Sequence, residues 1–195
     1  MGFGETASAS IATALPDVAS WLAEAKAPYC LIGGVAASIL GSARTTLDID
    51  VLIVLEETKW DAALALAGKH GLVPRISDCM AFARKSRVLL LNHHPSGVDV
   101  DVVIAGLPFE QELVQNAGLS EAGAIKMHVA RREDLIIMKA VAQRPRDMAD
   151  IEGMLNSASY IDWPYIESWV QQFAQALDRS DMVQALLQLK QKSQH

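Results

Sequence analysis

The feature that most restricts the fold of this chain is a change in hydrophobic periodicity near residue 130. Before it, apolar runs of strand length alternate with helical stretches, and glycine or proline separates them. After it, apolar residues recur every three or four positions, as in helices that cover a core. We therefore expect an α/β (α+β) core over residues 1–130 and a helical C-terminal part over residues 131–195, packed on that core.

The same patterns predict individual elements. Five strands are expected, over residues 29–32, 49–55, 87–92, 98–104 and 125–129, with the last one at an edge of the sheet. Helices are expected from Pro16 to about residue 27 and over residues 35–40, 60–70, 108–116, 133–142, 148–155, 165–177 and 182–189. Residues 93–97 contain the proline, serine and glycine of a hairpin loop, so the strands beside them should pair antiparallel.

Composition narrows the class of protein. The chain has 195 residues, of which 51% are hydrophobic and 21% charged, which is the balance of a globular domain with a sizeable core. Its net charge of -6 disfavours a surface that grips long nucleic acid, because such binding needs many basic contacts to phosphate. Cys30 and Cys79 have no paired spacing and are expected to be buried thiols. The absence of signal-peptide and membrane-span patterns predicts a cytoplasmic protein with no membrane partner.

Acidic residues gather on two of the predicted strands. Asp48 and Asp50 stand two apart, so in an extended chain their carboxylates project from one face. Asp101 lies on another strand, and if the two strands are adjacent, its carboxylate enters the same volume from about 5 Å away. Hard divalent cations offset the repulsion within such a cluster, so Asp48, Asp50 and Asp101 are the predicted ligands of Mg²⁺, with two ions expected. The structural alternative is a polar strand end beside a turn.

A pair of glycines precedes this acidic segment. Gly33-Gly34 follows a predicted buried strand and precedes a predicted helix, where backbone N–H groups can approach a phosphate without a Cβ in the way. The alternative is a tight turn that needs a positive φ. Arg44 and Thr45 stand just before the acidic pair, where they either contact phosphate oxygens or complete a loop.

These residues carry a resemblance to a known family. Gly33-Gly34, the segment 44–50 (Arg-Thr-Thr-Leu-Asp-Ile-Asp) and a later aspartate in an apolar strand resemble the DNA polymerase β nucleotidyltransferase superfamily. Glu133 to Lys139 and the Arg-Pro-Arg-Asp-x-x-Asp pattern of residues 144–150 are similar to its AbiEii-like branch, which includes toxins of type IV toxin-antitoxin pairs. The resemblance spans about residues 29–155. It implies the nucleotidyltransferase fold, a small mixed sheet with helices on one side and a helical C-terminal part.

The resemblance also implies roles for particular residues. The third carboxylate would bind one metal ion and help to deprotonate the acceptor hydroxyl. Asp101 fits this role because an apolar run follows it, and Asp99, on the same strand face, stays an alternative. Lys139 would contact phosphate or the catalytic carboxylates, unless it only extends from the apolar stripe of its helix to solvent.

The remaining predicted residues bind the nucleotide or support the pocket. Gly33, Gly34, Arg44 and Thr45 would hold the nucleotide phosphates, together with Lys139 and Arg146. Asp147 and Asp150, in the first turn of the following helix, are interpreted as organisers of the pocket that pair with neighbouring basic residues.

The predicted function is a magnesium-dependent nucleotidyltransferase that moves a nucleoside monophosphate from a nucleoside triphosphate to a hydroxyl acceptor. The acceptor is a small molecule, a tRNA or a protein, and the resemblance adds a toxin-like setting with an antitoxin protein as partner. The alternative is an inactive nucleotide-binding or protein-interaction module on the same fold. A dinucleotide-dependent oxidoreductase is disfavoured, since residues 33–38 lack the G-x-G-x-x-G spacing.

Overall fold

The computed structural model describes residues 3–42, 45–122 and 125–193 of the chain. Contacts divide the chain into two compact units. Unit 1 comprises residues 1–35 and 45–130, and unit 2 comprises residues 36–44 and 131–195. Each unit is described separately below.

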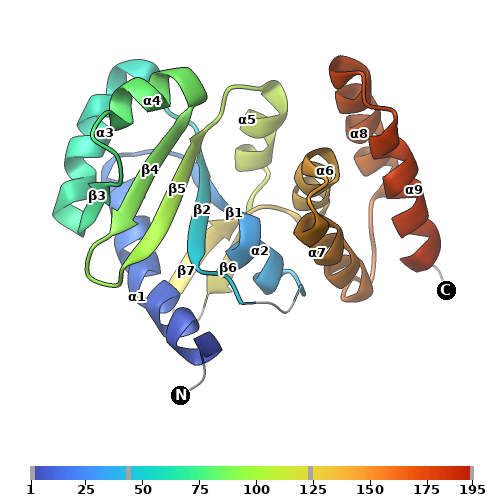
Figure 1. The fold of residues 1–195 in the computed structure, drawn as a ribbon, viewed down its shortest axis with the longest axis horizontal. Helices are drawn as coiled ribbons and strands as arrows, with labels where there is room; N and C mark the ends of the chain where they lie inside the picture. The colour runs from blue at the N-terminus through green and yellow to red at the C-terminus, as the bar shows by residue number, and fades with distance from the viewer. Residues whose placement is uncertain (1–2, 43–44, 123–124, 194–195) are drawn as a thin grey trace. The chain divides into compact units, whose positions relative to one another are not determined.

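Unit 1 contains a mixed sheet, which confirms the predicted α/β class (Figure 1). Within the described residues the sheet has seven strands in the order β3-β4-β5-β2-β1-β7-β6. The β2–β5 and β1–β7 pairs are parallel, and the other pairs are antiparallel. The strands are β1 (Tyr29–Ile32), β2 (Asp48–Ile53), β3 (Leu72–Pro74), β4 (Val88–His93), β5 (Val98–Ile104), β6 (Gly118–Ala122) and β7 (Ile125–Val129).

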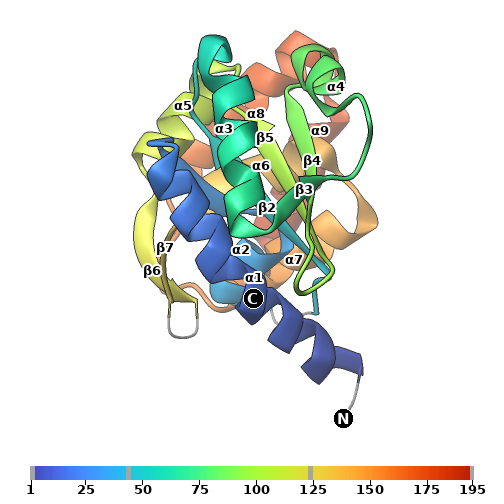
Figure 2. The ribbon, with the colours of Figure 1, turned by 90° about the vertical axis from the view of Figure 1, so that its left-hand side faces the viewer.

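The helices of unit 1 connect and cover these strands. They are α1 (Phe3–Glu24), the start of α2 (Gly33–Ile39), α3 (Trp60–Ala67), α4 (Cys79–Ser86) and α5 (Pro108–Gln115), with 3₁₀ turns at Glu57–Lys59 and Gly68–His70. Figure 2 shows α1 and α3 side by side against one face of the sheet. The predicted helix 60–70 is thus an α-helix followed by a 3₁₀ turn, which ends at Gly71 with a φ of 70°.

Alternation along β4 and β5 decides which face of the sheet is covered. In β5 the even-numbered residues are buried and the odd-numbered ones only half-buried. The buried side of β4 ends in His93, whose Nε2 lies 2.9 Å from an Asp17 carboxylate oxygen of α1. Trp21 of α1 donates from Nε1 to the Ala63 carbonyl of α3 at 2.8 Å. The face with even-numbered β5 residues is therefore the one beneath α1 and α3, and the opposite face carries the half-buried residues.

Several elements differ from the sequence-based predictions. Helix α1 begins at Phe3 rather than at Pro16, which lies inside it, so the helix tolerates the loss of one backbone donor. The strand β7 is internal rather than at the edge, because β6, which was not predicted, pairs antiparallel with it. The short strand β3 and helix α4 were also not predicted. Helix α4 holds two basic residues in its last turn and buries only Cys79 and Ala83, so its apolar stripe is weak.

Unit 2 is helical, with its four main helices close to the predicted positions. They are α6 (Arg132–Ala142), α7 (Pro145–Asn156), α8 (Trp163–Leu177) and α9 (Asp181–Ser193). Helix α6 contacts each of the other three. The end of α2 also belongs to this unit, where the Leu40 carbonyl accepts hydrogen bonds from Arg132 Nη2 at 3.0 Å and Ser157 Oγ at 2.9 Å.

Two further predictions concern the thiols and the membrane. Cys30 and Cys79 are buried and no disulfide joins them, as predicted. Of the helices in the described parts of the chain, none combines the length and the apolar character needed to cross a bilayer.

Candidate functional site

Strand pairing places four aspartates on the open face of the unit 1 sheet. Strands β2 and β5 run parallel, with Asp48 opposite Asp99 and Asp50 opposite Asp101. Directly opposite residues of neighbouring strands project from the same face, about 4.8 Å apart along the hydrogen-bonding direction. We call these four residues the acid face. The sheet therefore meets the condition set by the sequence, that Asp48, Asp50 and Asp101 lie on adjacent strands and share a face.

The acid face is partly shielded from water. The Asp101 side chain is 34% exposed and that of Asp99 42%. Burial raises the pKa of Asp101 above its ordinary value, the Arg75 guanidinium opposes this rise, and repulsion from Asp48 and Asp99 adds to it. Burial is the largest of these causes, and repulsion from each neighbouring aspartate is smaller than the attraction to Arg75.

Arg75 is a member of this site that sequence reasoning missed. It follows the edge strand β3, and its backbone N–H donates to the Leu90 carbonyl of β4 at 2.9 Å. Its Nη1 lies 2.5 Å from Asp99 Oδ2, and its Nη2 donates to Asp101 Oδ1. In the sequence, Arg75 follows the Leu-Val-Pro segment at residues 72–74. It could have been assigned to the site only if this segment had been predicted to form a strand paired with β4.

The structure separates the two candidates for the third carboxylate. Asp99 accepts from Asn92 Nδ2 at 2.8 Å as well as from Arg75, and it lies opposite Asp48 at the start of β2. Asp101 lies opposite Asp50, further along the strand and less exposed. A ligand shared with Asp50 is therefore closer to Asp101, which favours the original choice.

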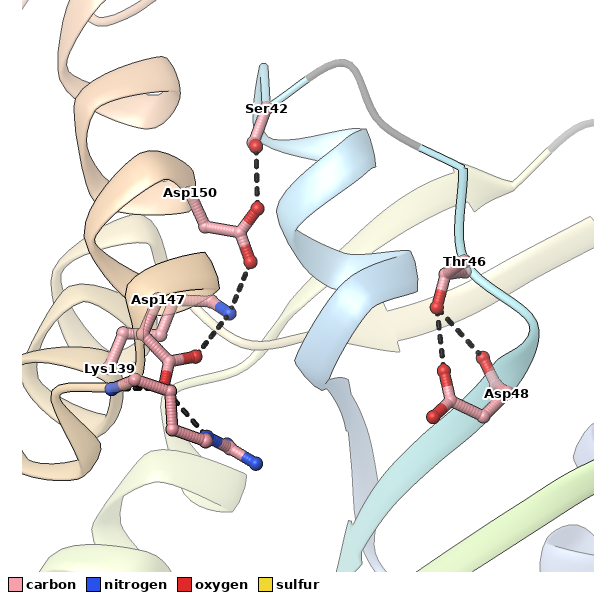
Figure 3. Close-up of polar contacts among 7 residues, drawn as sticks. Ser42, Thr46, Asp48, Lys139, Asp147 and Asp150 are labelled. Atoms are coloured by element: carbon pink, nitrogen blue, oxygen red, sulfur yellow. Dashed lines mark hydrogen bonds and ion pairs between the residues drawn. The ribbon is translucent and has the colours of Figure 1, made fainter. Parts of the chain in front are cut away.

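The segment before β2 positions Asp48. Thr46 Oγ1 donates to Asp48 Oδ1 at 2.6 Å, so the hydroxyl orients this carboxylate (Figure 3). Thr45 is exposed. Arg44, a predicted phosphate ligand, lies outside the described residues.

Gly33 has a structural reason that the sequence did not reveal. Its φ is 64°, and a Cβ built on it would lie 1.8 Å from Asp50 Oδ2. Helix α2 begins at Gly33 itself, so the glycine pair forms the start of the helix rather than a separate turn, and Gly34 is buried. The space left by the missing side chain receives the Asp50 carboxylate, so Gly33 lets the acidic strand and α2 approach each other. Phosphate binding by Gly33 and Gly34 stays a prediction.

The donor chemistry of the acid face fits a hard divalent cation, because carboxylate oxygens on one side of two adjacent strands are the ligands that Mg²⁺ prefers. As the side chains stand, no three His, Cys, Asp or Glu residues in the described parts of the chain are grouped closely enough to hold an ion. The physical reason is local pairing, since Asp48 is bonded to Thr46 while Asp99 and Asp101 are bonded to Arg75. Binding of an ion to Asp101 Oδ1 therefore requires this oxygen to exchange its contact with Arg75 for the ion.

Unit 2 contains a second group of charged residues, which we call the ion cluster: Ser42, Lys139, Arg144, Asp147 and Asp150. The Lys139 ammonium donates to Asp150 Oδ2 at 2.6 Å and to Asp147 Oδ1 at 3.3 Å (Figure 3). Ser42 Oγ donates to the other Asp150 oxygen at 2.8 Å, and Arg144 donates to Asp147 from its backbone N–H and its Nε.

Apart from Arg144, whose side chain is 77% exposed, the ion cluster is buried, which explains why its charges are paired. Lys139 is 5% exposed, Asp147 4% and Asp150 1%. The interpretation that Lys139 reaches solvent from its apolar stripe is therefore wrong. The predicted pairing of Asp147 and Asp150 with basic neighbours is confirmed, and their role as organisers of a nucleotide pocket stays a prediction. Arg146 is exposed on the first turn of α7. The predicted contacts of Lys139 and Arg146 with a nucleotide stay predictions.

Comparison with known proteins adds little to this geometry. No protein-family model matches the chain, and no curated protein matches it significantly. Among solved structures, the chain is similar to the crystal structure of an antigenic nucleotidyltransferase-like protein from Paracoccidioides brasiliensis. The two share 15% sequence identity with a TM-score of 0.45, over 90% of this chain and 92% of that one.

Proposed function

We propose that the protein is a magnesium-dependent nucleotidyltransferase that moves a nucleoside monophosphate from a nucleoside triphosphate to a hydroxyl acceptor. The observation that carries the proposal is the register of β2 and β5, which sets Asp50 opposite Asp101 with Asp48 on the same face. Carboxylates from two adjacent strands, beside a glycine at which a helix starts, provide oxygen ligands next to backbone that lacks side chains.

In this proposal Asp48, Asp50 and Asp101 would hold the Mg²⁺ ions. When bound, Mg²⁺ neutralises charge on the triphosphate and on the leaving group. A bond forms between the acceptor oxygen and the α-phosphorus, the α–β phosphoanhydride bond breaks, and pyrophosphate leaves. Asp101 would accept the proton of the acceptor hydroxyl. Gly33, Gly34 and Thr45 are the proposed neighbours of the phosphates, with Arg44, Lys139 and Arg146 as further predicted contacts.

The test is transfer of an α-labelled nucleotide. The protein is incubated with each labelled nucleoside triphosphate, Mg²⁺, and total tRNA, small hydroxyl compounds or cell protein as acceptor. We expect label on one acceptor class with wild-type protein and none with Asp50→Asn. Equal labelling by the two proteins, or none with any mixture, would refute the proposed activity.

The proposed toxin-like role needs a separate test. Expression of the wild-type chain should slow growth of the host cell, and Asp50→Asn should not. A neighbouring gene product that restores growth would be the antitoxin. If the variant is as harmful as the wild type, the harm does not come from nucleotidyl transfer.

A second candidate function is a nucleotide-binding or protein-interaction module without catalysis. The ion pairs of Arg75 with Asp99 and Asp101 favour it, because they occupy carboxylate oxygens that a metal ion would otherwise use. Ligands that bind the folded state raise the melting temperature. A rise with Mg²⁺ and nucleotide but no transfer would support a binding module, and no rise would support an interaction module.

A further inference from the structure

We propose that Arg75 is a positioning residue of the acid face that holds Asp99 and Asp101 in the metal-free protein and competes with a divalent cation for Asp101. The inference rests on the proposed function in one respect, since it takes Asp101 to be a metal ligand. It assigns a role to a residue in a part of the chain that the sequence did not connect with the site.

Geometry supports a bridging role for the guanidinium. Its two terminal nitrogens contact two different carboxylates, Asp99 at 2.5 Å and Asp101 on the same strand. Asp99 and Asp101 have one residue between them on β5, so their side chains project from the same face. The planar guanidinium, with two terminal nitrogens, can therefore contact both carboxylates. The Arg75 side chain is 27% exposed, which limits screening of the pairs by water.

Charge supports competition rather than cooperation. A guanidinium has no acceptor atom and cannot share a carboxylate oxygen with a metal ion without repulsion. A cation that binds Asp50 together with Asp101 Oδ1 must therefore replace the contact of Arg75 with Asp101, whereas the contact with Asp99 can remain. Asn92, which also donates to Asp99, would keep that carboxylate in place.

The position of Arg75 makes such a change inexpensive. Strand β3 has three residues and lies at the edge of the sheet, where local rearrangement disturbs the fewest neighbours. The backbone N–H of Arg75 stays bonded to Leu90 while the side chain rotates. The side chain can thus leave Asp101 without disrupting the sheet.

The experiment measures binding of Mn²⁺, as a probe for Mg²⁺, by electron paramagnetic resonance of the free ion. Removing the competitor should tighten binding, so we expect Arg75→Met to lower the Kd by roughly fivefold to tenfold, the range of a partly screened, charge-assisted pair. Arg75→Lys keeps the charge but lacks the fork, and should tighten binding by only about twofold. Melting temperatures in EDTA establish that each variant is folded.

Arg84→Met is the matched control. Arg84 lies on α4 and pairs with Asp61 at 2.7 Å, so this variant loses the same charge and an ion pair of the same kind elsewhere on unit 1. It should bind Mn²⁺ as the wild type does. Tightening by Arg84→Met equal to that by Arg75→Met would show an effect of net charge and overturn the inference.

A double variant, Arg75→Met with Asp50→Asn, tests whether Mn²⁺ binds at the acid face. The added Asp50→Asn change should abolish the tighter Mn²⁺ binding of Arg75→Met. Binding by Arg75→Met that is no tighter than wild type, or that survives Asp50→Asn, overturns the inference. Nucleotide transfer by the wild type together with unchanged Mn²⁺ binding by Arg75→Met would refute the inference alone. Tightened binding without transfer by any variant would refute the proposed function alone.

Discussion

On the acid face, Arg75 bridges two of four aspartates that remain partly exposed, whereas in the ion cluster Lys139 is enclosed between two aspartates with almost no exposure. The acid face has four aspartates and one basic partner, Arg75, whereas the ion cluster has two aspartates and two basic residues, Lys139 and Arg144. In the ion cluster each carboxylate named above has donors on both of its oxygens. Complete pairing in a buried site indicates a structural role, and carboxylates grouped on one face at a partly exposed site indicate a ligand.

The largest expected effect tests the structural side of this comparison. Lys139→Met removes the ammonium and leaves Asp147 and Asp150 buried without it, so the free energy of unfolding should fall by about 3–5 kcal/mol. Urea unfolding followed by circular dichroism measures the loss. Lys192→Met is the control, because Lys192 forms an exposed pair with Glu152 at 3.3 Å and its loss should cost less than about 1 kcal/mol. Equal losses would contradict the distinction drawn here.

The next effect tests the ligand side. Asp50→Asn should lower the rate of nucleotide transfer by at least about 100-fold, the scale of a lost charge-stabilising group, without lowering the melting temperature. Kinetics and thermal unfolding of the same preparation give both values. If Asp50→Asn clearly lowers the melting temperature, Asp50 has a structural role, as Asp147 and Asp150 do.

A pair of glycines sharpens the comparison further. Gly33→Ala and Gly97→Ala both force alanine into positive φ, 64° and 70°, and each should cost about 1–2 kcal/mol of stability. Only Gly33→Ala places a Cβ against the Asp50 carboxylate, since nothing lies within 4 Å of the corresponding position at Gly97. We expect Gly33→Ala to slow transfer by about tenfold or more through displacement of Asp50. Similar rates for the two variants would show that this contact is unimportant.

The smallest effect concerns pH. Because the pKa of Asp101 is raised in the folded protein, the folded state holds a proton more tightly than the unfolded state. Stability should therefore decrease as pH rises from the ordinary pKa of 3.8 through the raised value. Asp101→Asn should lack this decrease, which is below about 1 kcal/mol at so exposed a group. Melting temperatures across pH 3 to 8 in EDTA, a range of about five units around the raised pKa, measure it.

Glu24 provides a control of opposite sign. Hydrogen bonds from His70, and then from Lys69, lower the pKa of Glu24 below its ordinary value. Its contribution to stability is therefore present above the unfolded pKa and lost as pH falls through the folded one. Glu24→Gln should reduce the acid destabilisation that Asp101→Asn leaves unchanged. The same pH profile for both variants would contradict the assigned signs.

Much of the fold was predictable because local patterns decide it. The apolar alternation of residues 98–104 and the hairpin loop before it predicted the β4–β5 pair, and regular spacing predicted the helices of unit 2. The acid face was predicted from the two-residue spacing of Asp48 and Asp50 and from the assumption that the strand with Asp101 is adjacent. The register of β2 and β5 confirms that the two strands are adjacent. Strands β3 (Leu-Val-Pro) and β6 (Gly-Leu-Ser-Glu-Ala) were missed because neither forms an apolar run or a clear alternation of strand length, so tertiary pairing decides them.

The partners of individual side chains were not predictable in the same way. Arg75 lies 26 positions before Asp101, and Ser42 lies 108 positions before Asp150, so only the folded chain brings them together. The sequence predicted that Lys139 contacts phosphate or carboxylate groups, but it did not identify Asp147 and Asp150 as the carboxylates that surround it. Only one of the two requirements at Gly33 could be predicted. The positive φ is a local property of the chain, whereas the close approach to Asp50 joins the start of α2 to β2.

The membership of residues 36–44 in unit 2 has a consequence for how the chain can be divided. The polypeptide crosses between the units after Val35, after Arg44 and after Ala130, so the two folding units are interleaved rather than consecutive. A fragment cut after Ala130 would retain Leu40 and Ser42 but lack Arg132, Asp150 and Ser157, to which they are bonded. Leu40 and Ser42 would then lose these hydrogen bonds, so a cut after Ala130 divides unit 2 itself instead of separating it from unit 1.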